Sequence, residues 1–245
     1  MVAPTGSSSV AIASRGIVTD CQGNIYVIGS LQGTVQFGPI TVHSTEVSPF
    51  IAKLNYNGEW QFVKIPTQIL FSGNFDTAAG ISFDCNGNLY VVGGFRGTLQ
   101  WDPTLTPLDA GPSLETYVVR LDTNGNFAWE VQTVAVGPAA NSTQPFGIDN
   151  DCQGNIYITG TINGSPVLFG TTTLTPSGTG RDAYIAKLDP SDAFVWANQS
   201  TSTTNSHTEP RGIVNDCQGN IFIVGNLSAN PPVQYQQMLL LVAQL

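Results

Sequence analysis

Residues 16–29 read GIVTDCQGNIYVIG, and the same pattern returns three more times along the chain. The copies read GISFDCNGNLYVVG at 80–93, GIDNDCQGNIYITG at 147–160 and GIVNDCQGNIFIVG at 212–225. Their leading glycines are 64, 67 and 65 residues apart. Four copies at a nearly constant period predict a repeat architecture in which each copy is one structural unit.

A second block recurs downstream of the first. It reads FIAKLNYNGEWQF at 50–62, YVVRLDTNGNFAW at 117–129 and YIAKLDPSDAFVW at 184–196, and LVAQL at 241–245 matches its start. A single aromatic residue also recurs between the two blocks of each copy, at Phe37, Trp101, Phe169 and Tyr235. The segment around that aromatic varies in length from copy to copy.

Each copy is expected to contain four strands. Residues 25–28 alternate and are rich in β-branched and aromatic types, which is typical of a strand. The preceding Asp-Cys-Gln-Gly-Asn predicts a turn, because Asp can accept downstream amides and Gly allows a positive φ. The second block predicts another hairpin, with Asn-Gly as its turn. No amphipathic helix is expected.

The fold class that follows is all-β, a β-propeller with four blades of about 65 residues. A sheet with two apolar faces cannot bury them alone, and stacking the copies around an axis covers both faces. We expect one domain over residues 1–245, with repeats at 16–79, 80–146 and 147–211, and a last repeat made of 212–245 plus 1–15.

The ring is predicted to close through the N-terminus. The fourth copy ends at its third strand, and residues 1–15 occupy the sequence position of the missing one, so an N-terminal strand joining the last blade would hide an open edge. Three alternatives remain: two chains forming an eight-bladed ring, a piece of a longer array, and extra strands within the variable segments.

The pattern G-I-x-x-D-x-x-G-N-x-Y-x-x-G, followed by F/Y-[IV]-[AV]-[KR]-L-[DN], resembles the SBBP repeat and is similar to the NHL repeat. The resemblance covers about residues 16–245. It implies a propeller that serves as a binding or scaffold module, and a location that is extracellular, on a cell surface or associated with a virion. The departures are a longer repeat and the cysteine after the aspartate.

Composition excludes several classes of partner. Charged residues make up 10% of the chain and its formal net charge is −9, which argues against nucleic acid and anionic membrane surfaces. No run of 18 apolar residues is present, so membrane insertion is not expected. The polarity comes from hydroxyls and amides, with 18 Ser and 25 Thr.

The repeated turn is interpreted as a folding device. A catalytic acid or a calcium ligand is the alternative, but a catalytic acid is needed once, whereas this aspartate occurs in all four copies with its glycine and asparagine. The structural motif residues are Asp20, Gly23, Asn24, Asp84, Gly87, Asn88, Asp151, Gly154, Asn155, Asp216, Gly219 and Asn220.

The four cysteines that follow the aspartates are expected to be free thiols. Cys21, Cys85, Cys152 and Cys217 could form a four-thiolate metal site on a symmetric circle, but structural zinc ligands usually come in close pairs. We favour a small buried thiol below each hairpin. No cofactor or metal site is predicted, although a cation in the central channel remains an alternative.

A few other residues are candidates for ligand contacts. Lys53, Arg120 and Lys187 share one strand position, where a solvated strand face or an interblade ion pair is favoured over a ligand-binding cation. The aromatics of the fourth strand are assigned to interblade packing. Trp101, on the variable segment, is the candidate exposed aromatic for ligand contact. Asp149 breaks the repeat, since the other copies have Val or Ser there.

The function predicted from these observations is a non-catalytic binding or scaffold module that holds a glycan or protein partner. No catalytic residue is assigned. One alternative is a carbohydrate-active hydrolase or lyase with paired carboxylates at the central pocket. Another is a structural subunit of a particle or assembly. Whether the chain is a monomer or self-assembles is left open.

Overall fold

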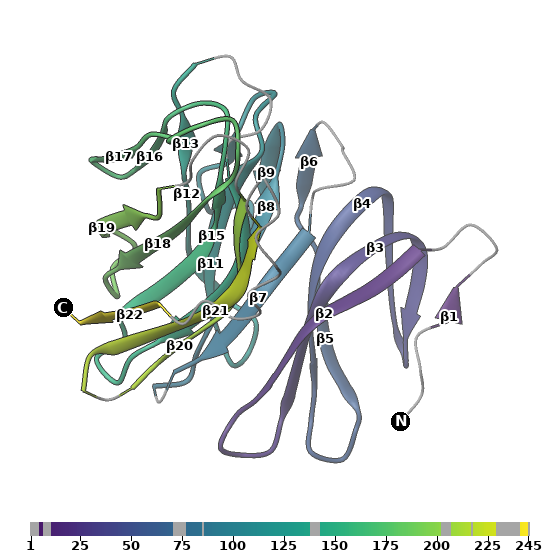
Figure 1. The fold of residues 1–245 in the computed structure, drawn as a ribbon. Coiled ribbons are helices and arrows are strands. Elements are labelled where there is room, and N and C mark those ends of the chain that lie inside the picture. Colours follow the sequence, from purple (N-terminus) through teal and green to yellow (C-terminus); the bar gives the residue numbers. More distant parts are fainter. Residues whose placement is uncertain are drawn as a thin grey trace.

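The computed structural model describes residues 5–6, 11–70, 77–84, 86–137, 143–201, 207–216, 218–228 and 241–244. These residues form an all-β structure of strands joined by turns, with no helix among them (Figure 1). In this part of the chain there is accordingly no helix with the length and apolar character needed to cross a bilayer.

Each repeat folds into one antiparallel sheet whose strands follow one another in sequence order. We call these the first to fourth sheets. The first contains β2 (Ala11–Thr19), β3 (Ile25–Phe37), β4 (Ile40–Leu54) and β5 (Trp60–Lys64). The second contains β7 (Thr77–Phe83), β8 (Asn88–Phe95), β11 (Glu115–Asp122) and β12 (Phe127–Gln132). The third contains β14 (Thr143–Asn150), β15 (Ile156–Ile162), β18 (Asp182–Leu188) and β19 (Phe194–Gln199). The fourth contains β20 (His207–Asn215), β21 (Asn220–Ser228) and β22 (Leu241–Gln244).

The variable segments do add strands of their own. In the first copy β3 and β4 continue as one long hairpin, paired as far as Phe37 and Ile40. The second and third copies have a small separate sheet each. In the second, β9 (Thr98–Gln100) pairs with β10 (Leu108–Asp109) and with β6 (Gln68–Leu70), a strand from the end of the first repeat. In the third, β16 (Val167–Phe169) pairs with β17 (Thr172–Leu174) and with β13 (Val134–Ala135), a strand from the end of the second repeat.

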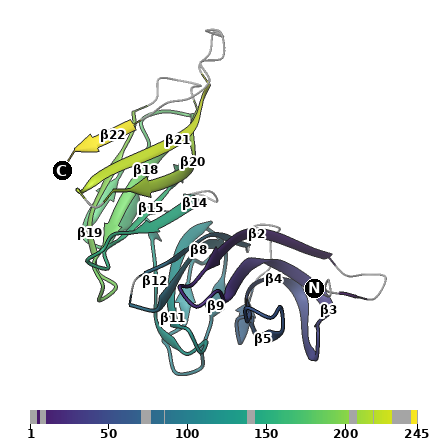
Figure 2. The ribbon, with the colours of Figure 1, turned by 90° about the horizontal axis from the view of Figure 1, so that it is seen from below.

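The four sheets stack face to face, with their first strands innermost. β2 contacts β7, β7 contacts β14, and β14 contacts β20, so each innermost strand lies against the next (Figure 2). Buried apolar side chains fill the three interfaces. The row therefore curves around its innermost strands, with the first and fourth sheets at its two ends.

Glycine allows the innermost strands to approach one another. A Cβ atom at Gly16 would lie 2.9 Å from Cγ2 of Ile81, and one at Gly80 or Gly147 would lie 3.1 Å from the isoleucine of the next sheet. Such contacts are tighter than packed side chains tolerate. The leading glycine of each repeat is therefore explained by close packing between sheets.

Ring closure by the N-terminal strand is wrong for the described residues. Strand β1 (Thr5–Gly6) pairs with β3 of the first sheet, Thr5 opposite Gln36, and not with the fourth sheet. The reason is local: β3 extends past the end of its pairing with β2 at Gln32, and leaves a free backbone edge close to the N-terminus. In Figures 1 and 2, β1 and β22 lie at opposite ends of the molecule. Residues 1–4, which belonged to that prediction, lie outside the described residues.

Candidate functional site

One groove meets all four sheets. It encloses about 270 Å³ and is lined by residues that include Arg15 from β2, Ala79 from β7, Phe146 from β14 and Arg211 from β20. These four residues occupy the same place in the repeat, directly before the leading glycine. The groove therefore marks the common centre of the four copies.

A β-bulge places these side chains in the groove. The register of each first strand shifts at this position, between Ser14 and Gly16 in the first sheet and between Pro210 and Gly212 in the fourth. The second and third sheets shift at Ala79 and Phe146. A bulge inserts one unpaired residue and redirects its side chain. Here it turns one side chain per copy towards the centre.

The groove carries two guanidinium groups. Arg211 lies 5.1 Å above the ring of Phe146 and donates a 2.8 Å hydrogen bond to Glu209, which holds it in place. Glu209 also accepts a 2.6 Å bond from Arg181. Arg15 is exposed and has no hydrogen-bond or ion-pair partner among the described residues. Thr77 and Gln144 add polar groups to the lining.

None of these four residues was predicted as a site residue from the sequence. The repeat was taken to begin at the glycine, so the residue before it, which is Arg15, Ala79, Phe146 or Arg211, was left out. The available signal was a residue that changes from copy to copy directly before a glycine that recurs in all four. Only the bulge, which depends on strand pairing, shows that the four side chains share one space.

The repeated aspartates are occupied within their own turns. Asp20 accepts bonds from the backbone of Gln22 and Asn24 at 2.9 Å, from the Asn24 side chain at 2.7 Å and from the Tyr26 hydroxyl at 3.1 Å. Burial alone would raise the pKa of the Asp20 carboxyl, but these bonds together hold that pKa below its ordinary value. Gly23 has a φ of 80°, as the turn requires.

The other three turns repeat this geometry. Asp84 and Asp151 accept the same four bonds from their own copies, while Asp216 lacks the hydroxyl because Phe222 replaces the tyrosine. Carboxylate oxygens that already accept these hydrogen bonds stabilise the hairpin, and they have little remaining capacity to bind an external ligand.

The buried-thiol interpretation is wrong for two of the four cysteines. Cys21 and Cys152 are exposed, because each follows its aspartate onto the solvent side of the turn. Cys85 and Cys217 lie outside the described residues. Within the described ranges no three His, Cys, Asp or Glu side chains gather as metal ligands would.

Two of the three cations at the shared strand position reach the next copy, whereas Lys187 lies 5.4 Å from the ring centre of Tyr157 in its own sheet. Lys53 Nζ donates a 2.7 Å bond to the carbonyl oxygen of Thr123 in the second sheet and lies 5.3 Å from the ring centre of Tyr26. Arg120 bonds in the same way to the carbonyl of Pro190 in the third sheet, at 3.3 Å. The partners are backbone carbonyls, whereas the sequence suggested an ion pair.

Trp101 is not available to a ligand, so its prediction as an exposed contact is wrong. Its side chain is 1% exposed and packs 5.8 Å from the ring of Tyr117 and 5.6 Å from that of Phe127. The variable segment folds back over the interface between the first and second sheets, and the aromatic fills that core. Phe169 does the same in the next interface.

Two glutamates outside the groove lining have raised pKa values: Glu115 is buried and Glu130 is half-buried. Burial raises the pKa of Glu115 to about 7, against hydrogen bonds from Thr133 and the Ala135 backbone that lower it. Burial likewise raises the pKa of Glu130 to about 7; this side chain accepts a bond from the Trp101 backbone at 3.1 Å. A pKa near 7 suits a general acid, but the bonds to these carboxyls come from segments that pack on the second sheet, namely Thr133 and Ala135 for Glu115 and Trp101 for Glu130.

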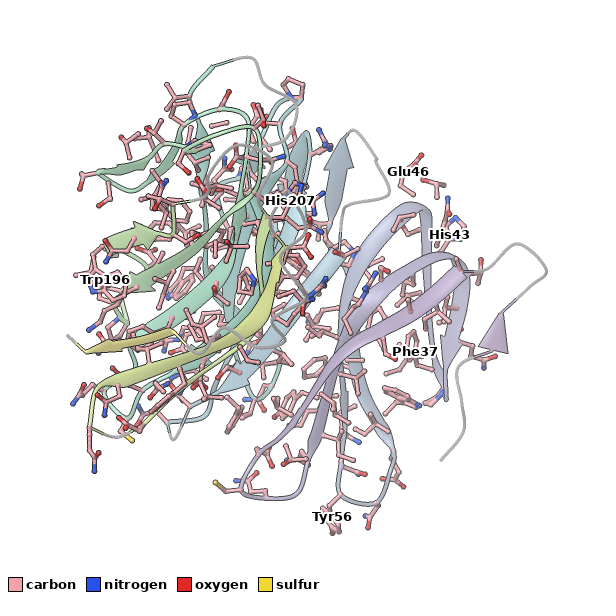
Figure 3. The ribbon with its side chains drawn as sticks, in the orientation of Figure 1. Phe37, His43, Glu46, Tyr56, Trp196 and His207 are labelled. Carbon is pink, nitrogen blue, oxygen red and sulfur yellow. The ribbon has the colours of Figure 1, made fainter. Side chains whose placement is uncertain are left out.

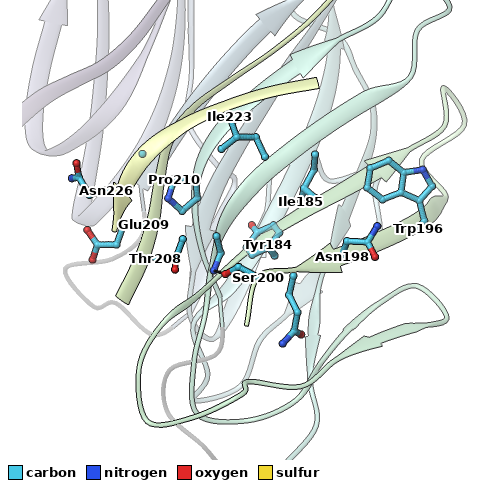
Figure 4. Close-up of a pocket in the computed structure, with 13 residues that line it drawn as sticks. Tyr184, Ile185, Trp196, Asn198, Ser200, Thr208, Glu209, Pro210, Ile223 and Asn226 are labelled. Atoms are coloured by element: carbon cyan, nitrogen blue, oxygen red, sulfur yellow. Dashed lines mark hydrogen bonds between the residues drawn. The ribbon is translucent and has the colours of Figure 1, made fainter. Parts of the chain in front are cut away.

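A second cleft lies between the third and fourth sheets (Figure 4). It encloses about 130 Å³ and is bordered by apolar side chains that include Trp196, Ile185 and Ile223. At the two preceding interfaces the corresponding space holds Trp101 or Phe169. The equivalent aromatic of the fourth copy, Tyr235, lies outside the described residues. Because its counterparts fill the two preceding interfaces, we interpret the cleft as part of an interface core and not as a ligand site.

No family model and no curated protein matches the sequence, so the resemblance to the SBBP repeat stays a prediction. Among solved structures, the chain is similar to a protein of unknown function from Bacteroides caccae, with 8% identity and a TM-score of 0.45 over 93% of this chain. Others are the Hadza microbial sialidase Hz136, with 11% identity and a TM-score of 0.40 over 93% of this chain, and YCF48 bound to D1 peptide, with 10% identity and a TM-score of 0.32 over 97%.

The chain spans 61% and 58% of the length of the first two of these structures, and 70% of the third. TM-scores of this size do not establish a shared fold. The groove and its residues are therefore interpreted from their own geometry.

Proposed function

We propose that the chain is a binding or scaffold module of the propeller type, with its ligand held in the groove between the innermost strands. The observation that carries this proposal is that the bulged residue of every copy lines the same groove. The bulge positions repeat, but the side chains on them do not. A repeated framework with varied residues at its centre is how a scaffold presents a binding site.

The ligand proposed for this groove is the acidic end of a glycan. A guanidinium group binds a carboxylate through two parallel hydrogen bonds, and Arg15 supplies such a group. Arg211, which bonds to Glu209 through one nitrogen, adds a second guanidinium to the lining. Phe146 offers an apolar face beside them, and Gln144 can bond to hydroxyls. Two positive groups also make the groove unfavourable for the central cation that the sequence left open.

The hydrolase or lyase alternative needs paired carboxylates at the centre. The described residues that line the groove include two arginines and no Asp or Glu. No described feature of the groove favours that alternative, and a protein partner with an exposed carboxylate is the remaining competitor.

The test is calorimetric titration with oligosaccharides that end in a uronic acid and with their neutral hexose counterparts. The acidic sugar should bind and the neutral one should not. Arg15→Ala should weaken binding about tenfold or more, since a charge-assisted bond contributes roughly 1.5–3 kcal/mol. Lys64→Ala, which removes a cation on β5, is the matched control and should leave binding unchanged.

Equal binding of the two sugars, or full binding by Arg15→Ala, would contradict the glycan assignment. Failure of every sugar, together with capture of an acidic peptide that depends on Arg15, would favour the protein partner instead.

We also propose an extracellular, cell-surface or virion-associated location. The support is the low content of charged residues and the abundance of Ser and Thr. Fractionation of cells that express the full-length protein, with detection by antibody, is the test; recovery in the cytosolic fraction alone would contradict it.

A further inference from the structure

The three internal interfaces are built from one set of contacts. In each, the leading glycine of one sheet receives an isoleucine of the next, as Gly147 receives Ile213. A second pair lies beside it: Ser82 bonds to Asn150 across the second interface, and Asp149 bonds to Asn215 across the third. In the first interface Val18 and Phe83 occupy these two positions and pack in the same core.

The first sheet presents one half of such an interface to solvent. Ile17 is 65% exposed, whereas its equivalents Ile148 and Ile213 are 7% and 6% exposed because a preceding sheet covers them. Val27, the strand partner of Ile17, packs on a core cluster that the first sheet forms by itself, made of Leu31, Val35, Phe37, Phe50 and Ala52 (Phe37 is labelled in Figure 3). The exposed face of the first sheet is therefore the half of the interface that supplies the isoleucine.

The fourth sheet presents the other half. Val214, which is equivalent to Val18, is 57% exposed, and Val224 is exposed as well. Among the described residues, a Cβ atom at Gly212 would meet Val224 of its own sheet and no isoleucine of a following sheet, unlike the other three leading glycines. This is the half of the interface that supplies the glycine.

We infer that a second copy of this chain docks head to tail, with its first sheet covering the fourth sheet of the other copy. Ile17 of one copy then lies on Gly212 of the next, and Thr19 lies against Val214, as in the internal interfaces. Every copy carries both halves of the contact, so the interface continues the established stacking. This inference does not depend on what the groove binds. A heterologous contact of this kind forms a closed ring or an open chain.

Disulfide trapping tests the contact directly. The variant Ile17→Cys/Gly212→Cys, with the native cysteines at 21, 85, 152 and 217 replaced by Ser, should oxidise to species of two or more chains. The matched control, Gly147→Cys/Ile213→Cys, has the internal version of the pair, in which the Gly147 Cβ lies 3.1 Å from Ile213 Cγ2. It should form a bond within one chain, since disulfides need neighbouring Cβ atoms.

A linked dimer or a ladder of multimers supports the proposal. If the control oxidises while the end-face variant stays reduced, or forms its bond within one chain, the proposal is overturned.

Sedimentation velocity provides a second test. The unmodified chain should sediment as a dimer or larger species, and both Ile17→Glu and Val214→Glu should be monomeric, because each buries a charge in the contact. Val195→Glu, at an exposed valine of β19, is the control and should assemble normally. An equimolar mixture of the two monomeric variants should recover a dimer, because each retains the half that the other has lost. A monomeric unmodified chain, or a mixture that stays monomeric, would overturn the proposal.

Discussion

Asn215 donates two hydrogen bonds to one carboxylate oxygen of Asp149 in the neighbouring sheet, one from its backbone and one from its side chain, each 2.7 Å long. Asp149 is the residue at which the third copy departs from the repeat. The departure is explained by its partner: the first interface pairs Val18 with Phe83, whereas the third pairs an acid with an amide. Burial raises the pKa of Asp149, although hydrogen bonds from Asn215 and Asn150 oppose this.

This pair predicts different outcomes for two substitutions. Asp149→Val leaves the Asn215 side chain without its acceptor in the interface and should lower the free energy of unfolding by about 1–3 kcal/mol. Asp149→Asn keeps an acceptor oxygen and removes a charge that burial disfavours, so stability at pH 7 should change little. Urea denaturation of both variants is the measurement, and equal losses would contradict the role given to the hydrogen bonds.

The aspartate turn predicts a stability difference between copies. Asp84→Ala removes the acceptor of four bonds, including that from the buried Tyr90 hydroxyl, and should destabilise the fold by about 2–3 kcal/mol. Asp216→Ala removes the acceptor of three bonds in a turn that lacks the tyrosine, and its effect should be smaller. Thermal unfolding compares the two; similar melting temperatures would show that the tyrosine bond is unimportant.

The buried carboxyl of Glu115 is predicted to lower the stability of the fold as the pH rises. Its pKa rises from 4.5 in the unfolded chain to about 7 in the fold, because its carboxyl is buried. Below pH 4.5 the group is protonated in both states and has no effect. Between pH 4.5 and 7 the unfolded chain releases the proton first, so stability falls, and above pH 7 the loss is complete.

The variant Glu115→Gln removes this ionisation. Its stability relative to the unmodified chain should therefore increase between pH 4 and pH 8, by roughly 3 kcal/mol for a shift of this size. Denaturant titrations across that range give the measurement. Glu59→Gln, at an exposed glutamate, should show no such trend, and a flat difference for Glu115→Gln would refute the assigned cause.

The leading glycines predict that Gly→Ala will destabilise the fold at an internal interface but not at the end of the row. A methyl group at Gly80 would lie 3.1 Å from Cγ2 of Ile148 and 3.2 Å from its backbone nitrogen, so Gly80→Ala should cost about 1–3 kcal/mol. For a methyl group at Gly212, the nearest atom among the described residues belongs to the exposed Val224 side chain, 3.3 Å away. Gly212→Ala should be nearly neutral for a chain kept dilute enough to be monomeric. Calorimetric unfolding distinguishes the two, and equal losses would argue against the interface.

The period, the four antiparallel sheets and the bonding of each aspartate turn follow from the order of the amino acids alone. These features are local: the carboxylate of Asp20 reaches donors no further than Tyr26, and each hairpin pairs residues close in the chain. Alternation and turn chemistry act over such distances, so a single copy contains the information.

The tertiary structure alone decided how the copies meet. The pairing of Thr5 with Gln36 replaced the expected closure, and the burial of Trp101 removed a candidate ligand contact. The convergence of Arg15 and Arg211 on one groove depends on the bulge and on the stacking of four sheets. Each of these results depends on contacts between residues that are far apart in the chain. The repeat pattern within a single copy does not specify such contacts.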